Sequence, residues 1–273
     1  MTMDKKYVLL PIFISLCAVI LSQIKPLYVY FEDPKIDLLI GKNVNFYEGW
    51  GNLGANLFVQ FVNIGDASGT VERIDIFICS KDSDYAHILT GQSYYLQPEA
   101  VNPNAIVSQM PFSYVTVNSH SVWTGFVNCY ATISKGKQKT IQDFIQQVEE
   151  DIDSKWIPNG PTVTIEDDLL NRIVAFSRKG LEDFTIGEYS LLAMAWVQDD
   201  SNPILKKAYS FSVYETDKAK LYRKEKEYPF GGGIIFPIPQ AQLQKMHFNS
   251  ILTEITEEEA INKLYEAYKK AQL

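Results

Sequence analysis

Histidine is scarce in this chain, and the sequence motifs of the common enzyme families are missing. The 273 residues include three histidines, His87, His120 and His247, which stand apart in the sequence without metal-ligand spacing or a neighbouring nucleophile. A histidine-based catalytic site therefore has few ways to form. Zinc-protease, Gly-x-Ser-x-Gly and P-loop motifs are absent from the sequence as well. We expect a protein that is not an enzyme and that binds no cofactor or metal.

Cysteine is equally rare, with Cys17, Cys79 and Cys129 as the three examples. Cys79 and Cys129 are about 50 residues apart in predicted strands, so an exported protein could join them in a disulfide. Strand alternation places Cys129 on the face of Val127, which has the character of a core face, and Cys79 on the face of Asp75. This parity favours two separate thiols over a disulfide.

An excess of positive charge is also lacking. The net charge is −8 and the isoelectric point is near 5.0. Because an acidic surface repels nucleic acid backbones and anionic lipids, neither is expected as a general partner. The chain is 46% hydrophobic and 21% charged, which excludes wholesale disorder, and its 13% aromatic content favours β structure.

One uncharged apolar run is present, from Tyr7 to Ile24 (residues 7–24), after Lys5 and Lys6. Its length of about 18 residues meets the lower limit for a helix that crosses a bilayer. A cleaved signal peptide and a lipoprotein signal are the alternatives, but the run lacks a well-placed cleavage site and Leu16 precedes the cysteine. The sequence therefore favours an uncleaved, single-pass signal-anchor that holds the protein to the membrane.

The orientation of this anchor is nearly balanced by charge. Lys5 and Lys6 flank one side of the run, and Lys25 and Lys35 flank the other. A short N-terminal tail (residues 1–6) with two lysines normally stays in the cytoplasm, so we expect an extracytoplasmic C-terminal domain. The near tie leaves a cytoplasm-facing domain as an alternative.

Short apolar runs with period-2 alternation dominate the next two hundred or so residues. Residues 55–62 form an almost continuous apolar run, which predicts a strand buried on both faces, and residues 71–79 alternate. We expect these two to pair as one hairpin, and residues 112–117 and 121–133 to pair as another.

The closing strands carry a resemblance to a known architecture. Gly187 and Tyr189 open an apolar strand over residues 189–197, and residues 208–214 return with strict alternation. This stretch resembles the last hairpin of immunoglobulin-like and fibronectin type III-like sandwiches. The resemblance implies a tyrosine corner, in which the Tyr189 hydroxyl bonds to nearby backbone. Leu191 stands where antibody domains have cysteine, so only the architecture class is implied.

The fold expected is mainly β: an Ig-like β-sandwich with accessory α-helices, preceded by one transmembrane helix. The sandwich spans residues 25–216 and includes a helical insertion near 140–155, where apolar residues follow a helical stripe from Ile141 to Ile152. A second short helix is expected over residues 166–179, with a strand as the alternative. Residues 217–273 are expected to form a charged, Gly- and Pro-rich linker and a C-terminal helical tail.

Two short motifs resemble ligand sites without meeting their physical requirements. Residues 49–54 match Gly-x-Gly-x-x-Gly, but a β-rich run follows where a dinucleotide site needs a helix N-terminus, so a strand connection is favoured. Asp199, Asp200 and Asn202 are the nearest approach to a calcium loop, although a Ca²⁺ site needs six to eight converging oxygens.

The function expected is a non-catalytic binding or assembly role at the membrane surface, with a protein partner and no nucleic acid. Two features carry this expectation: an apolar Gly- and Pro-rich loop over residues 230–239, and the apolar stripe of the C-terminal helix. The loop could instead fold as a lid over the sandwich. An anchored cytoplasmic sensor or effector and an ectoenzyme with a carboxylate site are the alternatives. The candidate interaction residues are Phe230, Ile234, Ile235, Phe236, Ile261, Leu264 and Tyr268.

Overall fold

The computed structural model describes residues 33–95, 109–158, 160–198 and 201–272, together with Ser15, Ala18 and Val19, which are helical. The expected anchor over residues 7–24 thus lies, apart from those three residues, outside the described part of the chain. Among the helices of the described residues, none combines the length and the apolar character needed to cross a bilayer.

Eleven strands are found among the described residues, and they contain more residues than the helices do. Long strands coincide with the alternating runs of the sequence, and short ones lie at the margins of the sheet. The strands are β1 (Ile36–Gly49), β2 (Asn52–Asn63), β3 (Gly69–Ser80), β4 (Ala86–Tyr95), β5 (Met110–Pro111), β6 (Val115–Val117), β7 (Ser121–Ala131), β8 (Gly187–Val197), β9 (Leu205–Val213), β10 (Phe248–Ile251) and β11 (Thr253–Ile255).

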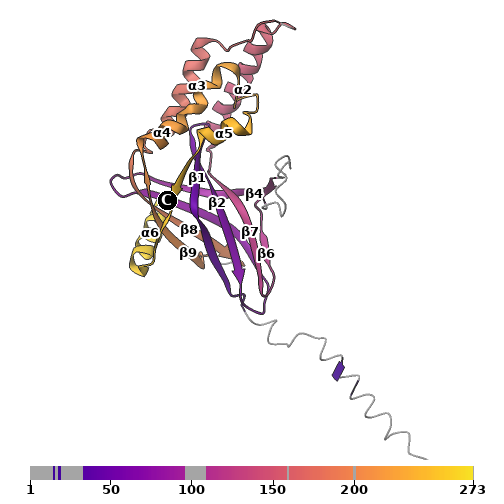
Figure 1. Cartoon of the computed structure of the whole chain (residues 1–273), viewed down its shortest axis with the longest axis vertical. Helices are drawn as coiled ribbons and strands as arrows, with labels where there is room; N and C mark the ends of the chain where they lie inside the picture. The colour runs from indigo at the N-terminus through magenta and orange to yellow at the C-terminus, as the bar shows by residue number, and fades with distance from the viewer. Residues whose placement is uncertain are drawn as a thin grey trace, which may run out of the picture.

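All of these strands belong to one antiparallel sheet, in the order β10-β1-β2-β7-β4-β3-β8-β9-β11, with β5 beside β4 and β6 beside β3. The two ends of this order, β10 and β11, are consecutive in the chain. One extended segment, residues 248–255, therefore pairs with β1 at one edge and with β9 at the other. The sheet is consequently barrel-like, curled so that its edges meet at this segment (Figure 1).

The expectation of a mainly β fold with accessory helices is confirmed, and the Ig-like sandwich is corrected to this single curled sheet. The two predicted hairpins before the helices are wrong. β2 pairs with β1 and β7, and β3 pairs with β4, β6 and β8, so β2 and β3 do not pair. β6 likewise pairs with β3, whereas β7 pairs with β2 and β4. Alternation identifies a strand but does not choose its neighbour.

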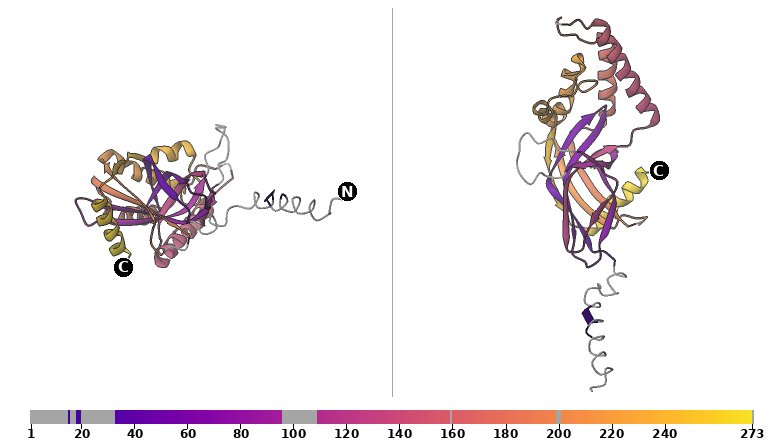
Figure 2. Two further views of the ribbon diagram at one scale, coloured as in Figure 1. Left: turned by 90° about the horizontal axis from the view of Figure 1, so that it is seen from below. Right: turned by 90° about the vertical axis from the view of Figure 1, so that its right-hand side faces the viewer.

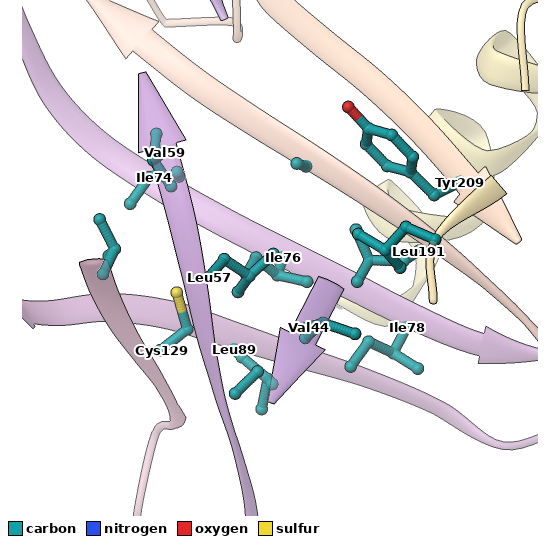
Figure 3. Close-up of a cluster of buried hydrophobic side chains, with 14 of the residues drawn as sticks. Val44, Leu57, Val59, Ile74, Ile76, Ile78, Leu89, Cys129, Leu191 and Tyr209 are labelled. Carbon is teal, nitrogen blue, oxygen red and sulfur yellow. The ribbon is translucent and has the colours of Figure 1, made fainter. Parts of the chain in front are cut away.

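The inside of the sheet is the main hydrophobic core. Val44, Leu57, Ile76 and Leu191 come from four strands and gather in this common interior (Figure 3). Towards the helical end the interior is aromatic, with Phe46 centred 5.1 Å from the rings of Phe211 and Phe248, and Phe184 and Tyr189 close by. Burial of apolar area is the dominant favourable term in folding, so this interior holds the sheet closed.

Three groups of helices pack around the sheet. α2 (Lys135–Lys155) and α3 (Asp167–Gly180) rise from one end of it, joined there by α4 (Glu215–Leu221), the 3₁₀ turns η2 (Tyr222–Lys226) and η3 (Tyr228–Phe230), and α5 (Gln240–Met246) (Figure 1). α6 (Glu258–Ala271) lies along the outer side of the sheet (Figure 2). The elements at the end of the sheet, α2, α3, α4, η2, η3 and α5, are together called the helical cap below. β1 starts at the opposite end of the sheet from this cap.

Position in the sheet explains which strands are apolar on both faces. In β8, Leu191, Ala193 and Ala195 face the interior, while Leu192 and Met194 face outwards and are covered by α6. β2 has the same apolar run but no helix over its outer face, so only its inward residues are fully buried and the others are half-buried. The two-faced burial expected for residues 55–62 is therefore wrong, and it is found in β8 instead.

Several local expectations are confirmed. The Tyr189 hydroxyl donates to the carbonyl of Thr185 at 2.8 Å, as a tyrosine corner requires, although the surrounding sheet is not a sandwich. Cys79 and Cys129 are both free, and Cys129 is buried in the core. Residues 49–54 form the turn between β1 and β2 and the start of β2, a strand connection without a helix after it.

Residues 217–273 contain the segment that closes the sheet. Leu252 lies between β10 and β11, and its N–H donates to the carbonyl of Lys42 at 2.8 Å. Ser250 reaches across from β10 and donates to the carbonyl of Ser212 in β9 at 2.9 Å. Residues 248–255 are thus part of the central sheet rather than of a linker or tail.

The free energy of unfolding should fall at alkaline pH as Tyr209 of β9 ionises. Tyr209 pairs with Glu254 of β11, which belongs to the segment that closes the sheet. Burial, and then the charge of Glu254, raise the pKa of Tyr209 to about 12. The folded state therefore favours the neutral phenol more strongly than the unfolded chain, in which tyrosine titrates near pH 10. This contribution is complete below pH about 10 and is lost as the pH rises towards 12.

The measurement is the free energy of unfolding of the wild type and of Tyr209→Phe at a series of pH values from 8 to about 11.5. Because phenylalanine cannot ionise, the variant should lose stability less steeply across this window. Other buried tyrosines titrate equally in both proteins, so the difference in slope isolates Tyr209. Equal slopes would contradict the expectation.

Candidate functional site

The helical cap has its own small core. The buried stripe of α2 consists of Ile141, Phe144, Val148 and Ile152, and Leu169 and Ile173 of α3 face it. The helical stripe expected between residues 140 and 152 is therefore confirmed, as is the helix expected over residues 166–179. Both helices are amphipathic, because the apolar side of each packs against the other helix and the polar side faces solvent.

A buried carboxylate joins this cap to the sheet. Glu48, at the end of β1, is 7% exposed. Its Oε1 accepts from the N–H of Gly51 at 2.5 Å and from the Ser177 hydroxyl of α3 at 3.0 Å. Its Oε2 lies 3.4 Å from the Tyr228 hydroxyl of η3 and 3.5 Å from Lys224 Nζ of η2. Three parts of the chain that are distant in sequence, the β1–β2 turn, α3 and the η2–η3 segment, thus converge on one side chain.

The tyrosine in this cluster is held as a hydrogen-bond donor. Burial, and then the adjacent charge of Glu48, raise the pKa of Tyr228 well above its ordinary value. The phenol consequently stays protonated, and Glu48 keeps a donor on each oxygen. An ionised carboxylate is acceptor-only, so this arrangement satisfies it and fixes α3 and η3 on the sheet.

A second contact fixes the base of the cap. Lys137 of α2 donates to the carbonyl of Gly51 at 3.1 Å and to Asn52 Oδ1 at 2.8 Å. Burial lowers the pKa of Lys137, and the charge of Glu48 partly offsets this. A Cβ at Gly180, the last residue of α3, would clash with the Gly51 carbonyl oxygen, so α3 can rest directly on the β1–β2 turn.

The candidate loop of residues 230–239 lies on the side of this cap. Ile234 and Ile235 are partly buried against the cap core. Phe230 and Phe236 remain 48% and 50% exposed. The loop thus combines the two expected arrangements, because two apolar residues cover the cap core and two aromatic residues face outwards.

The C-terminal stripe has a different environment. Ile261 and Leu264 pack against the outer face of β3, β8 and β9, and Tyr268 is 1% exposed. The Tyr268 hydroxyl donates to the fully buried Asp75 at 2.8 Å. Arg73 pairs with the same carboxylate and lies 4.6 Å above the Trp196 ring. The stripe therefore holds α6 on the sheet, with Tyr268 buried and Ile261 and Leu264 only partly exposed.

Two further exposed apolar residues are not among the candidates predicted from the sequence. Trp156 and Ile157 follow the end of α2 and are 63% and 65% exposed. In the sequence they directly follow the helix expected near residues 140–155. The sequence signal that could have indicated them is the presence of two large apolar residues in a turn, outside the apolar stripe of the helix.

These two residues and the two exposed phenylalanines come from neighbouring segments of the cap. A Cβ at Gly231 would be 3.0 Å from Ile152 and 3.2 Å from Phe236, and Ile152 is one helical turn before Trp156. The N–H of Ile165, after the α2–α3 turn, donates to the carbonyl of Pro229 at 2.9 Å. The name cap patch is used below for Trp156, Ile157, Phe230 and Phe236.

The residues considered for metal or catalytic chemistry remain apart. Asp199 and Asp200 lie outside the described residues, and the Oδ1 of Asn202 accepts from the Tyr265 hydroxyl at 3.2 Å. His120 pairs with Asp66 at 2.8 Å on the surface. Over the described ranges, no three His, Cys, Asp or Glu side chains are grouped to hold a metal ion.

Comparison with known proteins adds no relative to this picture. No protein-family model matches the chain, and no curated protein sequence matches it.

Proposed function

We propose that this chain is a non-catalytic binding or assembly protein, held to a membrane by residues 7–24, whose docking surface is the cap patch. The observation that carries the proposal is the exposure of Phe230 and Phe236, at 48% and 50%, on a rigidly fixed cap. Large apolar residues grouped on an otherwise polar surface mark interaction sites more often than chance exposure does. Aromatic residues are also the usual anchors of protein interfaces.

The placement of the cap agrees with this role. β1 begins at the end of the sheet away from the cap (Figure 1). An anchor that precedes β1 would therefore hold the cap away from the bilayer, where it meets other proteins rather than lipid. The extracytoplasmic side remains our proposal for the location of the domain, on the basis of Lys5 and Lys6.

The test is site-specific photocrosslinking in cells that make the protein. A photoreactive residue is placed at Phe236 in one variant and at Val122, which is 55% exposed on β7, in a matched control. We expect covalent adducts from position 236 and none from position 122. An adduct with a second copy indicates assembly, and an adduct with another protein indicates binding. Absence of adducts at both positions, or equal adducts at both, would overturn the proposal.

A further inference from the structure

The cap patch lies within a strongly acidic stretch of the cap. Residues 149–168, from the last turns of α2 to the first turn of α3, carry seven carboxylates and one lysine. Two of these carboxylates are paired, Asp151 with Lys155 at 2.8 Å and Asp168 with Arg172 at 3.3 Å. The others are exposed and are called the acidic rim below: Glu149, Glu150, Asp153, Glu166 and Asp167.

The acidic rim adjoins the cap patch at the end of α2. Glu149 and Asp153 are exposed one helical turn apart, and the N–H of Trp156, just past the helix, donates to the Asp153 carbonyl at 3.4 Å. The N–H of Glu166 donates to Asp151 at 2.8 Å, which holds the start of α3 beside the end of α2. Apolar rings and uncompensated negative charge therefore lie next to each other at the far end of the molecule.

We propose that the cap patch and the acidic rim together bind a cationic amphipathic segment of a partner protein. This inference rests on the proposed function and adds the chemistry of the partner. The apolar face of such a segment covers the exposed side chains of Trp156, Ile157 and Phe236, and its lysines or arginines meet the rim carboxylates. The same carboxylates repel an anionic bilayer and the phosphates of nucleic acid.

The arrangement separates affinity from selectivity. Apolar contact supplies attraction that depends little on sequence, whereas the rim sets the sign of charge that the partner must carry. Binding should therefore weaken as ionic strength rises, because exposed charges are screened beyond about 8 Å at 0.15 M salt. An amphipathic segment with acidic residues in place of basic ones should be rejected.

The test uses the full chain in nanodiscs of zwitterionic lipid and two fluorescent peptides of about 18 residues, or five helical turns. One peptide is built from leucine and lysine and the other from leucine and glutamate in the same amphipathic pattern. We expect the leucine–lysine peptide to bind in anisotropy titrations, and to bind less well at high salt. The leucine–glutamate peptide should not bind. Empty nanodiscs give the background that is subtracted.

Two variants separate the parts of the surface. The first neutralises four of the five rim carboxylates with Glu149→Gln, Glu150→Gln, Asp153→Asn and Glu166→Gln, and the second replaces Trp156, Ile157 and Phe236 with serine. Each should weaken binding of the leucine–lysine peptide by about tenfold or more. A charge control with Asp82→Asn and Asp84→Asn, two exposed acidic residues between β3 and β4, should bind as the wild type does. Unfolding midpoints of all variants show whether the fold is intact.

The inference is overturned if the leucine–lysine peptide fails to bind the wild type, or if both peptides bind equally. It is also overturned if the rim variant keeps its affinity, or if vesicles of anionic lipid bind the cap better than the peptide does. Photocrosslinks at position 236 together with any of these results would retain the proposed docking surface and remove only the partner chemistry. Loss of the crosslinks as well would remove both.

Discussion

A chain that ends at His247 should fail to fold, whereas a chain that ends at Ile255 should fold with reduced stability. The shorter chain lacks β10 and β11, the segment that pairs with β1 and β9. It also lacks Phe248, which is 1% exposed and whose ring centre lies 5.1 Å from that of Phe46. Removal of one buried phenylalanine side chain costs about 3–5 kcal/mol, and whole domains are stable by only about 5–15 kcal/mol.

Loss of the closing segment has a second cost, because it opens the sheet. β1 would expose unpaired N–H and C=O groups over Asn43–Phe46, and β9 would do so over Ala208–Ser210. Open edges of this kind pair with other chains, so we expect the shorter protein to aggregate. The chain that ends at Ile255 keeps β10 and β11 and loses α6. This loss uncovers the outer face of β8 but leaves the interior closed.

Circular dichroism and denaturant titration of the two truncated chains provide the measurement. The chain that ends at Ile255 should unfold in one cooperative transition, and the chain that ends at His247 should show none. A cooperative transition in the shorter chain would mean that residues 248–273 are a separable tail, as the sequence alone led us to expect.

Glu48→Ala should lower the free energy of unfolding by about 3–5 kcal/mol, because it breaks a buried ion pair from one side. The substitution leaves Lys224 without its carboxylate, and Lys224 has a side chain only 14% exposed. It also removes the acceptor of the Gly51 N–H and of the Ser177 hydroxyl, and buried donors without partners are costly. The cap should loosen before the sheet does, since these contacts join the two.

A double-mutant cycle identifies the source of this effect. The cycle uses Glu48→Gln and Lys224→Met, singly and together. Each single variant leaves one buried charge unpaired, while the double variant removes both charges and keeps an oxygen acceptor. We therefore expect the double variant to be more stable than the sum of the single losses predicts. Glu266→Gln, which breaks the exposed pair with Lys269, should cost under about 1 kcal/mol and serves as the surface control.

Hydrogen exchange locates the change within the molecule. In Glu48→Ala the amides of α2 and α3 should exchange faster, and the amides of β8 should keep their protection relative to global unfolding. Unchanged exchange in α2 and α3 would show that the cap is held by its apolar contacts alone. Because the cap patch lies on this cap, a loosened cap should also weaken the crosslinks at position 236.

The local elements of this fold could be predicted from sequence because local patterns encode them. The stripe from Ile141 to Ile152 matches a helical face, and α2 buries it. The Gly187 and Tyr189 entry predicted both a strand and the hydrogen bond that Tyr189 makes to Thr185. Each of these features depends on residues close together in the chain, so propensity and periodicity suffice.

The candidate surface was predicted only in part, because exposure depends on what covers a face. Tyr268 and Trp156 are both large aromatic residues near the end of a helix. Tyr268 is 1% exposed because Asp75 and the outer face of β8 receive it, whereas Trp156 is 63% exposed because its helix ends beyond the cap core. Nothing in either local pattern distinguishes the two, since the partner of Tyr268 lies 193 positions away in the chain.

By itself the sequence determined where several strands and the longer helices lie, that Cys79 and Cys129 face opposite sides of their strands, and that the net charge is negative. Only the tertiary structure decided that the sheet curls and is closed by residues 248–255, that Glu48 fastens a helical cap on its end, and that Phe230 and Phe236 stay exposed there. The physical reason is the separation in sequence between the residues that make contact. Periodicity records that a face must be buried, but the choice of what buries it depends on contacts between distant segments, whose geometry no single stretch encodes.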